Sequence, residues 1–185
     1  MTGQIPDNVI YRDEVYALAG VKGEGLYVPL DFGLTPVSPH TANWRGFVST
    51  YEVSNDHLFL NEMHVSIKEK SDIYPDINGI KPESKIEGIV HLDYKGINFK
   101  TNFTGKIIIV KDFIDSMYVH MGFQSPLSFR KVIELEFKEG DLISKKDLSD
   151  KIQKYRKKDY SDGKIKPEGD LMKWIDRTFS LDYDL

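Results

Sequence analysis

The sequence predicts a β-rich α+β fold, in which antiparallel strands form a curved sheet, a sandwich or a partial barrel and two helices follow at the C-terminal end. Apolar and polar residues alternate through residues 90–110, which is typical of half-buried strands. A second alternating pair of segments lies within residues 45–67 on either side of a turn signal. From Ser144 onward the apolar spacing changes to three and four residues, which is typical of helices.

The first half of the chain predicts strands separated by polar loops. Residues 11–18 and 25–31 are predicted strands, joined by a glycine-rich turn. Residues 34–41 carry two prolines, which exclude a helix and favour an extended loop. Residues 45–67 then predict a hairpin, because Ser54-Asn55-Asp56 separates two apolar strands.

Residues 90–110 predict a three-stranded meander. A tight turn at Lys95-Gly96 places Leu92 opposite Phe99, and a second turn at Thr104-Gly105 places Phe99 opposite Val110. The apolar residues then share one face, so a shift of one residue would bury the polar row. The pattern therefore predicts strongly specified pairing among three consecutive strands.

The C-terminal part predicts one more strand and two helices. Residues 117–129 are ambiguous, and residues 132–137 alternate again. Ser144 is a suitable N-cap for a first helix over residues 145–158, with Leu148, Ile152 and Tyr155 as a narrow apolar stripe. Pro167 suits the first turn of a second helix.

Length and composition predict a single domain over residues 1–185, with a β-rich body (1–143) and a helical part (144–185). The chain has 25 basic and 29 acidic residues and a net charge of −4, which disfavours nucleic acid as a partner. The sequence shows no signal peptide or membrane span. It contains no cysteine, so disulfides and thiolate metal sites are excluded and a cytoplasmic location is predicted.

A proline-bounded loop contains the candidate ligand-binding residues His40, Asn43, Trp44 and Arg45. Such loops often carry recognition, and Arg45 could hold an anionic group while Trp44 stacks on the ligand. In the structural alternative, Trp44 fills the core, Arg45 extends along it, and Gly46 permits a bulge.

Two histidine and carboxylate pairs are the candidates for a metal site. Glu62 and His64 share one face of a predicted strand, as do His91 and Asp93, and the two pairs would converge if those strands were neighbours. The same residues are also expected on the polar face of a half-exposed sheet. We therefore predict no metal and no other cofactor.

The first predicted helix is strongly basic. It carries seven basic and two acidic residues, so it could hold phosphate or an acidic partner. The basic residues are Lys145, Lys146, Lys151, Lys154, Arg156, Lys157 and Lys158. The alternative is a solvated helix face without a partner.

The hairpin resembles a known sequence pattern. Trp44-Arg45-Gly46-Phe47, Thr50-Tyr51-Glu52-Val53 and Leu58-Phe59-Leu60 are similar to W-R-G-[FY], T-[YW]-E-[IV] and L-[FY]-L in small uncharacterised bacterial proteins. The resemblance implies no activity. Small acidic proteins of this kind include immunity proteins that neutralise a toxin.

No catalytic motif accompanies these features. The sequence has no G-x-S-x-G elbow, no phosphate-binding glycine loop before a helix and no H-E-x-x-H. We therefore predict a cytoplasmic, non-catalytic interaction or ligand-binding protein, with an immunity-like role as one form, that binds a protein or a small molecule. The alternative is a hydrolase-type enzyme that uses His, Asp and Glu from separate strands.

Overall fold

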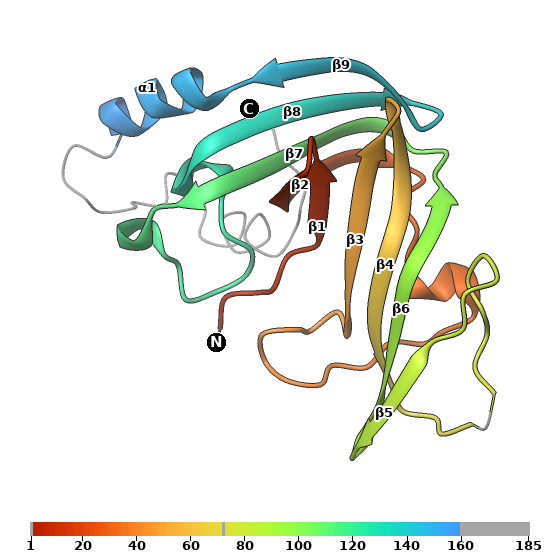
Figure 1. Cartoon of the computed structure of the whole chain (residues 1–185). Coiled ribbons are helices and arrows are strands. Elements are labelled where there is room, and N and C mark those ends of the chain that lie inside the picture. Colours follow the sequence, from red (N-terminus) through yellow and green to blue (C-terminus); the bar gives the residue numbers. More distant parts are fainter. Residues whose placement is uncertain (1, 72, 160–185) are drawn as a thin grey trace.

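The computed structural model describes residues 2–71 and 73–159. Within these ranges the chain forms nine strands, three short 3-10 helices and one α-helix (Figure 1). The strands are β1 (Asn8–Tyr11), β2 (Glu14–Glu24), β3 (Phe47–Ser54), β4 (His57–Ile67), β5 (Glu83–Glu87), β6 (Ile89–Lys100), β7 (Thr104–Phe113), β8 (Phe129–Lys138) and β9 (Asp141–Asp147). The helices are η1 (Pro29–Phe32), η2 (Asp115–Met117), η3 (Pro126–Ser128) and α1 (Ser149–Asp159). The β-rich fold class is thus confirmed.

The strands form one curved sheet that closes partly into a ring (Figure 1). Its order is β3-β1-β2-β7-β8-β9-β4-β6-β5, and β3 also pairs with β4. The pairing of β1 with β3 is parallel and the other strand pairings are antiparallel. Between β9 and β4 the register consists of one pair, Asp141 with His57. The sheet is therefore a partial barrel, from which β6 and β5 extend beyond β4.

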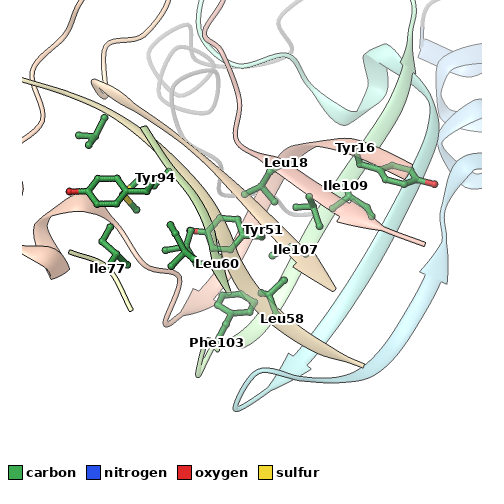
Figure 2. Close-up of a cluster of buried hydrophobic side chains, with 14 of the residues drawn as sticks. Tyr16, Leu18, Tyr51, Leu58, Leu60, Ile77, Tyr94, Phe103, Ile107 and Ile109 are labelled. Carbon is green, nitrogen blue, oxygen red and sulfur yellow. The ribbon is translucent and has the colours of Figure 1, made fainter. Parts of the chain in front are cut away.

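The main hydrophobic core lies inside the curve of the sheet. Figure 2 shows side chains from β2, β3, β4, β6 and β7 converging there, together with Ile77 and Phe103 from connecting segments. Tyr51, Leu60 and Tyr94 are almost completely buried, as is Phe103 from the connection between β6 and β7. Because successive side chains of a strand point to opposite faces, Ile107 and Ile109 of β7 enter this core. One continuous core thus holds both sides of the partial barrel together.

A second apolar cluster lies on the other face of β7 and β8. Ile108 and Val110 of β7 pack there with Val132 of β8. Helix α1 follows β9 in Figure 1 and covers this cluster with Ile152, which is 1% exposed. The sheet is therefore buried on both faces in this region, which explains the unbroken aliphatic run in β7.

The predicted meander is wrong, because β6 pairs with β4 and β5, whereas β7 pairs with β2 and β8. The expected turn at Lys95-Gly96 lies within β6, where residues 96–98 form a bulge opposite β4. Gly96 has a φ of 71°, a backbone conformation that occurs in bulges as well as in turns. The expected turn at Thr104-Gly105 begins β7, where a Cβ on Gly105 would lie 2.2 Å from the backbone oxygen of Lys22 in β2.

Three predictions for the first half are also corrected. The predicted strand over residues 11–18 is divided by a two-residue turn at Arg12 and Asp13, whose φ angles are 54° and 61°. The predicted turn around residues 20–25 instead continues β2, which pairs with β7 as far as Glu24. The predicted strand 25–31 ends in the helix η1 rather than in a sheet. The hairpin formed by β3 and β4 is confirmed.

The prediction of two C-terminal helices is not confirmed. Ser144 lies in β9, since β8 continues to pair with that strand up to Asp147, and α1 begins at Ser149. The second expected helix, beginning at Pro167, lies outside the described residues. None of the helices in the described ranges is long and apolar enough to cross a membrane.

Candidate functional site

A cavity of about 280 Å³ lies between the sheet and the segment that joins β7 to β8. Ala17 and Ala19 of β2 form one wall together with Val110 of β7. Ala19 is the residue without a pairing partner in the irregular pairing of β2 with β7 between Leu18 and Gly20, and Ala17 lies two residues before it. Small side chains beside a local bulge leave space that larger residues would fill. The hollow is therefore a product of the β2 sequence.

Aromatic rings form the rest of the apolar lining. Phe113 ends β7 and Phe129 begins β8, and their ring centroids are 5.1 Å apart in an edge-to-face arrangement. Phe123 contributes from the connecting segment. The polar groups among the lining residues belong to Gln4, Gln124 and the half-exposed Tyr118. The cavity thus combines an apolar interior with a few neutral hydrogen-bonding groups.

The connecting segment is held in place by its own hydrogen bonds. The Gln124 side chain accepts a hydrogen bond from Val119 N–H at 2.9 Å and donates to Val119 O at 2.7 Å. The Gln4 N–H donates to Gly122 O at 2.7 Å. A Cβ on Gly3 would lie only 2.9 Å from the Tyr118 hydroxyl oxygen. These contacts tie the outer wall of the cavity to the N-terminal segment.

The four predicted ligand-binding residues lie in the loop before β3, which contacts this N-terminal segment. His40 Nδ1 accepts a hydrogen bond from the Ala42 N–H at 3.3 Å. Asn43 is buried, and its Oδ1 accepts from Gly46 N–H at 3.1 Å. The Trp44 N–H donates to Gln4 Oε1 at 3.0 Å, while the Trp44 side chain is 45% exposed. The loop therefore reaches the cavity through Gln4.

Arg45 forms an ion pair inside the fold. Its Nη1 and Nη2 donate to both carboxylate oxygens of Asp7, at 2.8 and 2.9 Å. The guanidinium also lies over the rings of Phe47 and Phe123, with centroid distances of 4.6 and 5.3 Å. The Asp7 side chain is 6% exposed and that of Arg45 is 26% exposed. Arg45 thus fixes the loop to the residue before β1 and to a ring of the cavity wall.

The Asp7 carboxylate has a third donor in the Ser49 N–H, at 2.7 Å from Oδ1. The neighbouring Tyr51 hydroxyl donates to Tyr27 O at 2.9 Å. Burial, followed by the charge of Asp7, raises the pKa of Tyr51. The phenol is therefore neutral and acts as a hydrogen-bond donor.

The predicted metal candidates lie on neighbouring strands, but they form hydrogen-bonded pairs. His64 of β4 is opposite Asp93 of β6, and its Nδ1 is 2.6 Å from the Asp93 carboxylate. His91 Nδ1 lies 3.0 Å from the Ser66 hydroxyl, and the rings of His64 and His91 stack with centroids 5.7 Å apart. Glu62 is exposed and pairs across the sheet with Lys95.

No group of three or more metal-ligating side chains suited to an ion occurs among the described residues. The His64 and Asp93 side chains are 39% and 41% exposed on an open sheet face, and they are not among the residues that line the cavity. Catalysis by a histidine and carboxylate pair usually uses an enclosed site that excludes water. The arrangement is therefore typical of a solvated sheet surface.

The sequence did not single out the residues that line the cavity. They come from the N-terminal segment, from β2 and β7, and from residues 113–129, and no spacing rule connects these stretches. The one available signal was the ambiguous segment 117–129, which carries aromatic residues without a strand or helix period. Comparisons of the chain with models of protein families, with curated proteins and with solved structures found no significant match.

Proposed function

We propose that this chain is a non-catalytic binding protein that holds one small, mainly apolar molecule in the cavity beside β2 and β7. The observation that carries this proposal is a lining of aromatic and small apolar side chains with only a few polar groups. Ligand sites in proteins commonly have this composition. An immunity-like role and a cytoplasmic location stay predictions of the sequence.

The volume sets the size of the molecule. An apolar protein cavity of about 150 Å³ can bind benzene, so a cavity of about 280 Å³ has room for a ring with a short substituent. Ligand pockets for drug-sized molecules begin at roughly 300 Å³. The proposed ligand is therefore a small aromatic or short aliphatic compound rather than a large cofactor.

The position of the His64 and Asp93 pair favours binding over catalysis. A hydrolase-type enzyme was the alternative prediction, and it would place a base beside the bound molecule. The His64 and Asp93 pair lies on the exposed face of β4 and β6, and neither residue lines the cavity. The cavity itself brings neutral polar groups, not a base, to its ligand.

The test uses the full chain with indole and toluene as probes. A molecule that binds only the native state raises the melting temperature. At a free ligand concentration of 100 times Kd, binding adds about 2.7 kcal/mol to the free energy of unfolding. We expect at least one probe to stabilise the protein. Ala19→Phe, which fills the cavity, should abolish this effect. Ala17→Leu is a second, milder filling variant in case the first does not fold.

Val15→Phe is the matched control, because Val15 lies in the same strand and is 57% exposed. It should leave the probe effect unchanged. If neither probe stabilises the wild type, or if folded Ala19→Phe and Ala17→Leu variants respond as the wild type does, the proposed function is wrong.

A further inference from the structure

Strand β5 forms an open edge of the sheet. It is the last strand in the sheet order, beyond β6 (Figure 1), and its pairing with β6 runs from Glu83 with Asp93 to Glu87 with Ile89. Within the part of the chain that the structure describes, residues 83–87 make no backbone–backbone hydrogen bond beyond this pairing. All five residues of β5 are exposed. The outer edge of the strand therefore offers backbone donors and acceptors to another strand.

The charges along this edge alternate in sign. Lys81, Glu83, Lys85 and Glu87 follow one another at every second position. Alternate residues of a strand share a face, so the charges within β5 lie on one face of the sheet. In the single chain, Lys85 pairs with Glu87, and the Glu83 carboxylate lies 4.0 Å from Lys95 Nζ. The side chains in these pairs are between 57% and 83% exposed, so the pairs are solvated and add little to stability.

A second, antiparallel copy of the same strand fits this order of charges. Residues that are directly opposite in an antiparallel pair lie on the same face of the sheet, so a two-fold axis between two identical strands passes beside a single residue. An axis at Ser84 places Glu83 opposite Lys85 of the second copy. The same axis places Glu87 opposite Lys81 of the second copy. Every charge of the edge then faces an opposite charge, whereas an axis at Lys85 would oppose like charges.

The other face of β5 also suits a second copy. Ile86 lies opposite Val90 of β6, and Val90 lies opposite Ile67 of β4. This apolar row ends in solvent, because Ile86 is 55% exposed while Val90 is fully buried. With the axis at Ser84, Ile86 would pack against Pro82 of the second copy. The pairing would therefore cover an exposed apolar side chain and match charges at the same time.

We propose that β5 is a self-association surface, through which two copies of the chain pair antiparallel about Ser84. This inference is independent of the cavity and of the proposed function. A two-fold contact uses the β5 edge of both copies, so the assembly stops at two. The contact is short and buries less than the roughly 1,200 Å² of a standard stable interface. The dimer is therefore weak, with an expected dissociation constant of about 0.1 mM.

The experiment is sedimentation velocity of the full chain over a concentration series that spans this value. We expect the wild type to change from monomer to dimer. Lys85→Glu and Glu83→Lys should each weaken the dimer at least about tenfold, because the two-fold axis produces each like-charge contact twice. An equimolar mixture of the two variants should dimerise as the wild type does, because each charge at positions 83 and 85 again faces an opposite charge.

Lys145→Glu is the matched control. Lys145 is exposed on β9, whose register with β4 is a single pair, so that most of its second edge is also open. The substitution makes the same change in net charge as Lys85→Glu and should leave the dimer unchanged. Because the substituted side chains are exposed, all three variants should fold and melt close to the wild type.

A wild type that stays monomeric throughout the series would overturn the proposal. A dimer that survives in the Lys85→Glu variant, a mixture of variants that stays monomeric, or an equal loss in the Lys145→Glu variant would overturn it as well. Loss of the dimer in Lys85→Glu but not in Glu83→Lys would refute the axis at Ser84.

Discussion

The ion pair between Asp7 and Arg45 offers a sharp test of how the loop before β3 is held. Asp7→Ala removes a carboxylate that accepts two hydrogen bonds from Arg45 and one from the Ser49 N–H. The substitution leaves the Arg45 guanidinium between two aromatic rings without its counterion. It also leaves a buried backbone donor unsatisfied, because Ser49 is 0% exposed.

The magnitude follows from these contacts. Removing one partner of a buried ion pair costs about 3 to 5 kcal/mol, and Arg45, at 26% exposed, places the pair at the lower end. The unsatisfied Ser49 N–H adds about 1 kcal/mol or more. We therefore expect Asp7→Ala to lower the free energy of unfolding by about 4 kcal/mol. Asp7→Asn keeps an acceptor for Ser49 and should cost less.

The assay is urea unfolding of the wild type, Asp7→Ala, Arg45→Ala and the double variant. Because the two side chains act on each other, the double variant should lose less than the sum of the single losses, with a coupling of about 1 to 2 kcal/mol. Single losses below about 0.5 kcal/mol, or a coupling near zero, would refute the view that Arg45 is a structural anchor. They would restore Arg45 as a residue free to bind a ligand.

Two further predictions concern the backbone and pH. Gly46→Ala should cost at least about 2 kcal/mol more in urea unfolding than Gly33→Ala. Both glycines have positive φ, near 75°, where a Cβ costs roughly 1 to 2 kcal/mol. At Gly46 the added Cβ would also lie 2.4 Å from Val37 O. Similar losses of stability in the two variants would contradict this reasoning. Hydrogen bonds from Ser149 lower the pKa of the Asp147 carboxyl group. The ionised carboxylate therefore stabilises the fold at pH values above the usual aspartate pKa near 4. This stabilisation is lost as the pH falls and the carboxylate is protonated. The melting temperature of Asp147→Asn should therefore be below that of the wild type at pH 7, with the gap closing towards pH 3; a constant gap in calorimetric scans would disprove it.

The sequence pattern of two apolar strands around a turn correctly predicted the hairpin of β3 and β4, because the residues that specify the hairpin are adjacent in the chain. Asn55 and Asp56 adopt φ angles of 49° and 56°, which Asn and Asp tolerate better than most residues and which a tight hairpin turn requires. The flanking strands then pair in a register that begins with Ser54 and His57.

The same kind of local pattern failed for residues 90–110. Alternation and a glycine at positive φ describe a strand and an interruption, but they do not say which strand lies alongside. Each of these strands has a neighbour from an earlier part of the chain, since β6 pairs with β4 and β7 pairs with β2. Gly96 lies in a bulge, and Gly105 lies where two backbones approach closely. In the sequence alone, neither glycine can be distinguished from a glycine in a turn.

The candidate sites show the same limit. The sequence correctly placed His64 on one polar strand face and His91 with Asp93 on another, but only the structure shows that these strands are neighbours. The cavity depends on two alanines beside an irregular pairing and on rings from a distant connection. Such a site arises from the absence of large side chains, which leaves no motif to recognise.

The closure of the partial barrel has a consequence for how the chain folds during synthesis. Asn8 of β1 pairs with Thr50 of β3, and His57 of β4 meets Asp141 of β9. Contacts between residues so far apart form slowly, because long loops lose entropy before any contact is made. On the ribosome, β1 must wait for β3 to emerge, and the ring cannot close before Asp141 has been synthesised. Until then the open strand edges are exposed to other chains. We therefore expect the yield of soluble protein during expression to depend strongly on temperature and on the speed of translation, even though the completed fold is stable.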